Sequence, residues 1–110
     1  MATPAVGTTL VKDEAARVVI WDGSGMAGLG DRTADFLRTQ GINVIQVAVA
    51  GGYSPATKIE IFNGKPNTVA YLSQLMGVAS ANIWNTYDPS AGLDIRVTLG
   101  GDWAQNNSLP

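Results

Sequence analysis

Apolar residues recur along this chain of 110 residues with the spacings of strands and of helices. Residues 17–21 are almost continuously apolar, which predicts a strand buried on both faces. Residues 57–62 and 94–99 alternate apolar with polar side chains, so each predicts a strand with one buried and one solvent-facing side. Residues 42–49 are rich in β-branched side chains, which also favours a strand, and residues 81–84 form a fifth, shorter candidate.

Two other segments repeat apolar residues at every third or fourth position, which places them on one face of a helix. The first segment follows the glycine-rich residues 22–28 and stops before Gly41, a residue typical of helix C-termini. The second begins at Pro66, whose ring suits a first helical turn, and stops at Gly77.

The resulting order is β-α-β-β-α-(β)-β. Because both alternating strands keep their charged residues on one side, we expect both helices on the other side. The predicted fold is therefore an α/β (α+β) two-layer sandwich, with two helices on one face of a mixed sheet of four or five strands. Residues 16–104 form its single domain, residues 1–15 are expected to be a poorly ordered linker or boundary remnant, and residues 105–110 a frayed tail.

Residues 21–28, Trp-Asp-Gly-Ser-Gly-Met-Ala-Gly, contain the G-x-G-x-x-G spacing of a dinucleotide-binding loop between a strand and a helix. Two features argue against a nucleotide. Asp22 would repel a pyrophosphate, and residues 48–52, at the end of the next strand, offer no acid for a ribose. We therefore predict a structural loop in which the glycines allow the turn and Asp22 or Ser24 caps helix amides. The loop residues are Asp22, Gly23, Ser24, Gly25 and Gly28.

The composition removes several kinds of chemistry. Without Cys or His the chain has no thiol, no disulfide and no imidazole base, and it lacks the ligands of most zinc sites. A net charge of −2 with no Lys/Arg cluster argues against nucleic acid, and no apolar run approaches the about 20 residues of a membrane helix. The acids Asp22, Asp31, Asp35 and Asp102 have no spacing that forces two together, as glycoside hydrolysis would need. We expect no enzymatic activity, no cofactor and no metal.

Several of these segments resemble one family. Residues 18–29 resemble the V-x-V-x-N-G-S/T-G-x-x-G-L opening of the C-terminal domain of LytR–CpsA–Psr cell-envelope proteins, with Asp22 where Asn is common. Residues 94–103, Asp-Ile-Arg-Val-Thr-Leu-Gly-Gly-Asp-Trp, are similar to its closing D-I-x-V-x-L-G-x-D-W. The resemblance continues between them through residues 34–37, 41–44, 65–66 and 69–78, with Ile42 where Phe is usual, and spans about 16–104.

This resemblance implies an extracytoplasmic accessory module. In such proteins the domain follows a membrane anchor and a catalytic domain that transfers glycopolymers to the cell wall. The anchor would then lie outside this fragment, which itself inserts into no membrane, and the family supplies no catalytic residues for it.

Two functions remain open. The first is binding of cell-wall glycan or peptidoglycan by the solvent-facing side of the sheet, where polar side chains point away from Ile59, Ile61, Ile95 and Val97 and an aromatic ring stacks on a sugar. The candidate binding residues are Lys58, Glu60, Asp94, Arg96, Tyr53 and Trp84. The alternative is a protein-interaction or self-association module that uses a strand edge or an apolar patch. A polar strand face is also what any solvated sheet shows.

Overall fold

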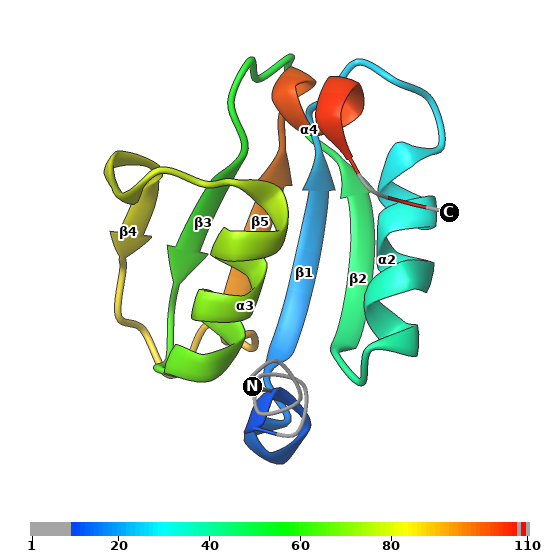
Figure 1. Ribbon diagram of the computed structural model, residues 1–110. Coiled ribbons are helices and arrows are strands. Elements are labelled where there is room, and N and C mark those ends of the chain that lie inside the picture. The colour runs from blue at the N-terminus through cyan, green and yellow to red at the C-terminus, as the bar shows by residue number, and fades with distance from the viewer. Residues whose placement is uncertain (1–9, 108, 110) are drawn as a thin grey trace.

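A mixed sheet of five strands, in the order β2-β1-β5-β3-β4, forms the centre of the fold (Figure 1). The computed structural model describes residues 10–107 and 109. β1 runs parallel to β2 and β5, whereas β3 is antiparallel to β5 and parallel to β4. The strands are β1 (Arg17–Asp22), β2 (Asn43–Val49), β3 (Lys58–Ile61), β4 (Ile83–Asn85) and β5 (Ile95–Leu99).

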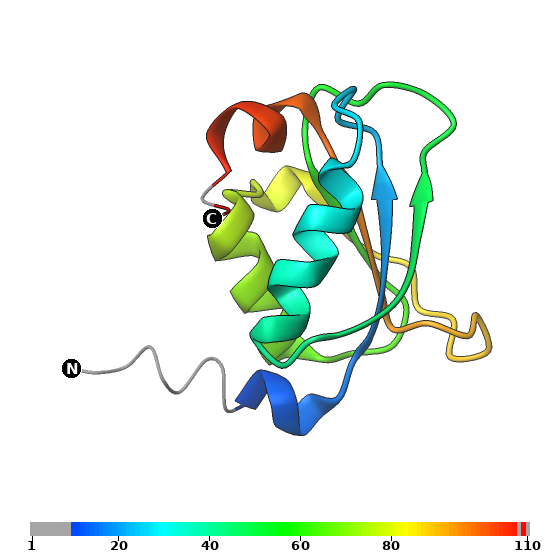
Figure 2. The same cartoon turned by 90° about the vertical axis from the view of Figure 1, so that its right-hand side faces the viewer.

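The helices lie together on one side of this sheet and leave the other side open, as the edge-on view in Figure 2 shows. They are α2 (Leu29–Thr39), α3 (Pro66–Met76) and α4 (Gly101–Asn106), with a short 3-10 turn η1 (Ser80–Asn82). The predicted α/β (α+β) fold class with its mixed sheet is confirmed. None of the helices in the described part of the chain has the length and apolar character needed to cross a membrane.

The core lies between the helices and the strand residues that point toward them. Every second residue of β3 and β5 enters it, as the alternation in the sequence predicts, and Val18 and Ile20 of β1 enter it as well. Each buried Leu or Ile contributes about 1.5–3 kcal/mol to the free energy of unfolding, so this layer dominates stability. Its most buried members include Val18, Ile20, Leu29, Leu37, Ile59, Leu72, Ile95, Val97 and Leu99.

Both ends of the described chain are more ordered than expected. Residues 10–14 form a helical turn, and Val11 belongs to the core cluster, so the expectation of little order is wrong for residues 10–15. Residues 1–9 of that predicted linker lie outside the described residues. The predicted tail begins inside α4, which is anchored by Trp103: its indole Nε1 donates to Thr33 Oγ1 of α2 at 2.9 Å.

The helical turn at residues 10–14 also caps α3. Lys65 at the N-cap of α3 makes no side-chain cap hydrogen bond. Instead the Glu14 carboxylate accepts the backbone N–H groups of Asn67 at 2.8 Å and Thr68 at 2.7 Å, and the Thr68 hydroxyl at 2.7 Å. Burial alone would raise the pKa of Glu14, but these hydrogen bonds outweigh burial and hold the pKa below its ordinary value of 4.5.

Replacing Glu14 by Ala is expected to lower the free energy of unfolding by about 1–2 kcal/mol, because the first-turn amides lose their acceptor. Because the folded pKa is lowered, this contribution is present above the ordinary pKa of 4.5 and is lost as the pH falls through the folded value. Urea denaturation at pH 7 and in a pH series measures both effects. Asp13→Ala, at the exposed neighbour, is the control; equal losses in the two variants would contradict the capping role.

Candidate functional site

The glycine loop after β1 is organised around the carboxylate of Asp22. Its Oδ2 accepts the backbone N–H of Gly30 in the first turn of α2 at 2.8 Å. Its Oδ1 accepts the backbone N–H of Ser24 at 3.0 Å and the Ser24 hydroxyl at 2.6 Å. The Ser24 hydroxyl in turn accepts the N–H of Met26 at 3.1 Å. A phosphate approaching this end of α2 would therefore meet a carboxylate that already occupies the amides.

The glycines of the loop meet two separate demands. Gly25 and Gly28 have φ of 78° and 79°, in the left-handed region that side chains disfavour. Gly23 lies where a Cβ would come within 3.1 Å of the Leu99 carbonyl oxygen, so it lets the loop pack against the end of β5. The loop is thus shaped by backbone geometry as well as by Asp22.

On the open side of the sheet, Arg96, Glu60 and Trp84 lie side by side across β5, β3 and β4. The Arg96 Nε and Nη2 atoms donate to Glu60 Oε1 at 2.8 and 2.6 Å. The guanidinium also lies 3.8 Å from the centre of the Trp21 ring and 5.3 Å from that of Phe62. Arg96 is therefore held in one orientation by an ion pair on one side and aromatic faces on the other.

Lys58 and Trp84 form a second, more exposed pair on the same side. The Lys58 Nζ atom lies 5.8 Å from the centre of the Trp84 ring, within the range of a cation–π contact. Trp84 is 43% exposed although it is a large hydrophobic residue. The structure thus brings together four of the six candidate residues from the sequence: Lys58, Glu60, Trp84 and Arg96.

Asp94 is not part of this surface. It is only 2% exposed, and the expectation that it faces solvent is wrong. Arg17 donates to it three times, from the backbone N–H at 2.7 Å, Nε at 3.3 Å and Nη2 at 3.0 Å, and Asn63 Nδ2 donates at 3.3 Å. Burial would raise the pKa of Asp94, but the bonds from Arg17 outweigh it and lower the pKa. Asp94 ties the start of β1 to β5.

Tyr53, the sixth candidate, lies in the loop between β2 and β3 and packs beside Gly25. This loop, residues 50–57, and the loop of residues 86–93 both project beyond the strands on the open side (Figure 2). Each carries an exposed tyrosine, Tyr53 and Tyr87. The first loop is fixed by the Ser54 N–H to the Gly23 carbonyl and the second by the Asp88 N–H to the Phe62 carbonyl, both at 2.8 Å.

Trp21 and Phe62 were missed as members of this surface. The continuous apolar run of β1 predicted burial on both sides, which hid the alternation. Successive side chains of a strand point to opposite faces, so Trp21 lies on the same face as Arg17 and Val19, opposite to the core residues Val18 and Ile20. This two-residue periodicity is the signal in the sequence that places the Trp21 ring on the open side.

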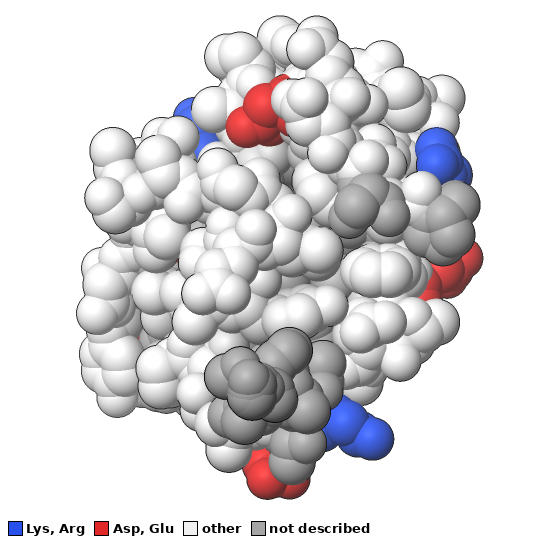
Figure 3. Space-filling model, viewed as in Figure 1, with Lys and Arg blue, Asp and Glu red and all other residues white. Residues whose placement is uncertain are grey.

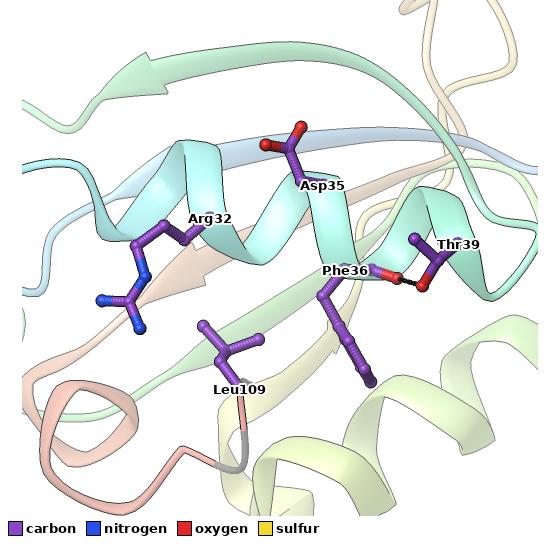
Figure 4. Close-up of a pocket in the computed structure, with 5 residues that line it drawn as sticks. All are labelled: Arg32, Asp35, Phe36, Thr39 and Leu109. Carbon is purple, nitrogen blue, oxygen red and sulfur yellow. Dashed lines mark hydrogen bonds between the residues drawn. The ribbon is translucent and has the colours of Figure 1, made fainter.

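The helix side of the molecule offers less chemistry. Figure 3 shows that its charged atoms are few and lie in small, separated groups. A shallow hollow of about 270 Å³ lies beside α2, lined by the α2 side chains of Arg32, Asp35, Phe36 and Thr39 and by Leu109 (Figure 4). It contains none of the candidate binding residues. Among the described residues no group of three or more acids lies close enough to hold a metal ion.

The comparison with protein families settles which class of domain this is. A family model described as LytR cell envelope-related transcriptional attenuator (LytR_C) matches residues 15–103. The chain belongs to this family. The resemblance seen in residues 18–29 and 94–103 is thereby confirmed, and the family marks the chain as an accessory domain associated with the cell envelope. Neither the curated proteins nor the solved structures gave a match.

The residues of the closing motif of the LytR_C domain hold the end of the sheet together. Asp102 accepts the backbone N–H of Thr57 at 3.0 Å, the Thr57 hydroxyl at 2.7 Å and the N–H of Trp103 at 2.7 Å. The Gly100 N–H donates to the same Thr57 hydroxyl at 3.0 Å. The motif therefore joins β5 and α4 to the start of β3, which is a structural task.

We predict that Asp22→Ala lowers the free energy of unfolding by about 1–3 kcal/mol, because the amides of Ser24 and Gly30 lose their acceptor. Asp22→Asn should lower the free energy of unfolding by less, since the amide oxygen of Asn still accepts one of these hydrogen bonds. Urea denaturation measures both, with Asp35→Ala on the exposed side of α2 as the control. A saturable rise in Tm of the wild-type protein with millimolar NAD or ATP would contradict the structural role of this loop.

Proposed function

We propose that this LytR_C domain binds cell-wall glycan on the open side of its sheet, as a non-catalytic extracytoplasmic module of a glycopolymer-transfer protein. One observation carries the proposal. The row across β5, β3 and β4 places a half-exposed indole, Trp84, next to the fixed polar pair Arg96–Glu60 and next to Lys58, on the side without helices.

The chemistry of this row suits a sugar chain. A pyranose presents apolar C–H groups on its faces and hydroxyl groups around its edge. An indole packs against such a face while adjacent charged side chains hydrogen-bond the hydroxyls. Because Arg96 is already held by Glu60 and Trp21, it loses little side-chain entropy on binding.

The aromatic residues of this side divide into two groups. Trp21 and Phe62 lie against Arg96 and cover the central strands, so packing alone accounts for them. Trp84 is not covered in this way. A strand face that is simply solvated has no need of an exposed tryptophan, so packing alone does not account for Trp84. Tyr53 and Tyr87 are also exposed, but Tyr53 packs against Gly25 and Gly101, so the proposal rests on Trp84.

We expect the isolated domain to co-sediment with purified cell-wall sacculi and Trp84→Ala to weaken that binding about tenfold or more, as for truncated interface tryptophans. The fold should survive, because the side chain is at the surface. Met26→Ala is a matched control: Met26 is 41% exposed, close to the 43% of Trp84, but lies in the glycine loop. Wild-type protein that stays in the supernatant at low salt would refute the proposal.

A separate observation favours association as the second candidate function. β2 forms an edge of the sheet, and its seven residues, Asn-Val-Ile-Gln-Val-Ala-Val, include no charge and no proline. Such an edge can pair with another strand. A bulge after Val44 and the bond from Arg38 Nη2 to the Val44 carbonyl at 2.9 Å restrict its first half. The second half, which ends at Val49 with 86% exposure, stays open to a second copy of the chain.

Self-association through β2 predicts a molar mass that rises toward that of a dimer across a concentration series in light scattering. Val49→Lys should restore the monomer without loss of Tm, because a charge at an exposed edge position opposes strand pairing. A monomer at every concentration would exclude this candidate for the isolated domain.

A further inference from the structure

We propose that the open face selects saccharide chains that carry acidic groups, with Trp84 as the platform for the ring and Lys58 as the partner of the acid. This inference rests on the proposed glycan-binding function and adds the ligand class to it. It follows from how charge is distributed among the residues of that face.

The Arg96–Glu60 pair contributes no net charge. Both donor atoms of Arg96 go to the same carboxylate oxygen, at 2.6 and 2.8 Å, and both side chains are partly buried. Because the Glu60 carboxylate already neutralises the charge of this guanidinium, an anionic ligand gains little net attraction from the pair, although the Nη1 group still has N–H donors to offer. The pair is therefore suited to neutral hydroxyl groups rather than to an acid.

Lys58 differs from Arg96 in this respect. Among the described residues the ion pairs are Arg17–Asp94, Arg38–Asp35 and Arg96–Glu60, and Lys58 takes part in none of them. Its ammonium lies over the Trp84 ring, where a cation–π contact holds the group without cancelling its charge. The strand residues of the open face therefore carry a net positive charge although the chain as a whole carries −2.

The positions of Lys58 and Trp84 relate the acid to the sugar ring. A pyranose stacked on the indole has its substituents around the rim of the ring, and the Lys58 Nζ lies 5.8 Å from the centre of that platform. A carboxylate or a phosphate on the sugar can thus accept a charge-assisted hydrogen bond from Lys58 while the ring stays on Trp84. A neutral sugar keeps the stacking contact and the hydrogen bonds of its hydroxyls but lacks this charge-assisted bond, so its binding should be weaker and less sensitive to salt.

Tryptophan fluorescence titration with three tetrasaccharides tests this inference: a neutral N-acetylglucosamine tetramer, a tetragalacturonate with carboxylates, and a phosphorylated mannose tetramer. We expect one or both acidic chains to bind at least tenfold more tightly than the neutral chain at low salt. Which acidic chain binds identifies the source of the acid. Lys58→Gln should remove this preference, so that acidic and neutral chains bind with equal affinity, whereas Lys12→Gln, at an exposed lysine outside the sheet, should keep it.

The outcomes separate the two proposals. Equal binding of acidic and neutral chains, or an acidic preference that survives in Lys58→Gln, would overturn the selection of acids and leave glycan binding intact. Failure of all three oligosaccharides to bind, together with failure to co-sediment with sacculi, would overturn both. Thermal melting of each variant verifies that the fold is retained, so loss of binding is not confused with unfolding.

Discussion

The structure depends on one constraint: the helices α2, α3 and α4 lie on the same side of the sheet. The central strands β1 and β5 are flanked by other strands, so their open side has to be shielded by side chains alone. Arg96 does this by spreading its guanidinium over Trp21 while it pairs with Glu60. Over these central strands the open side therefore consists of side chains held by one another, and the preorganised Arg96–Glu60 pair follows from the architecture.

Three carboxylates stabilise other parts of the fold through hydrogen bonds to backbone N–H groups. Glu14 holds the first amides of α3, Asp22 those of the glycine loop and α2, and Asp102 the corner between β5 and β3. Each carboxylate accepts hydrogen bonds from backbone N–H groups near the start of a helix, because those groups have no acceptor within the helix. These acids are therefore engaged with the protein itself, in keeping with membership of a family of accessory domains.

The sequence predicted those parts of the fold that depend on periodicity. Alternation located β3 and β5 and put Lys58, Glu60 and Arg96 on one side, because strand parity needs no tertiary information. It failed for Asp94, since Arg17, which buries it, is distant in sequence and reaches it only through the pairing of β1 with β5. Residues 10–15 and α4 were not predicted because both are too short for a periodic pattern and are ordered by contacts with distant residues, through Val11 and Glu14 in the first and Asp102 and Trp103 in the second.

The central claim, that the open side of the sheet is the binding surface, is tested most directly by NMR. Backbone amide shifts of the isotope-labelled domain would be followed during titration with soluble fragments of digested cell wall. The account predicts that the shifting amides cluster in β3, β4 and β5, around Lys58, Glu60, Trp84 and Arg96, with α2 and α3 unaffected. Shifts confined to the β2 edge or to the helix side, or none at all, would contradict it.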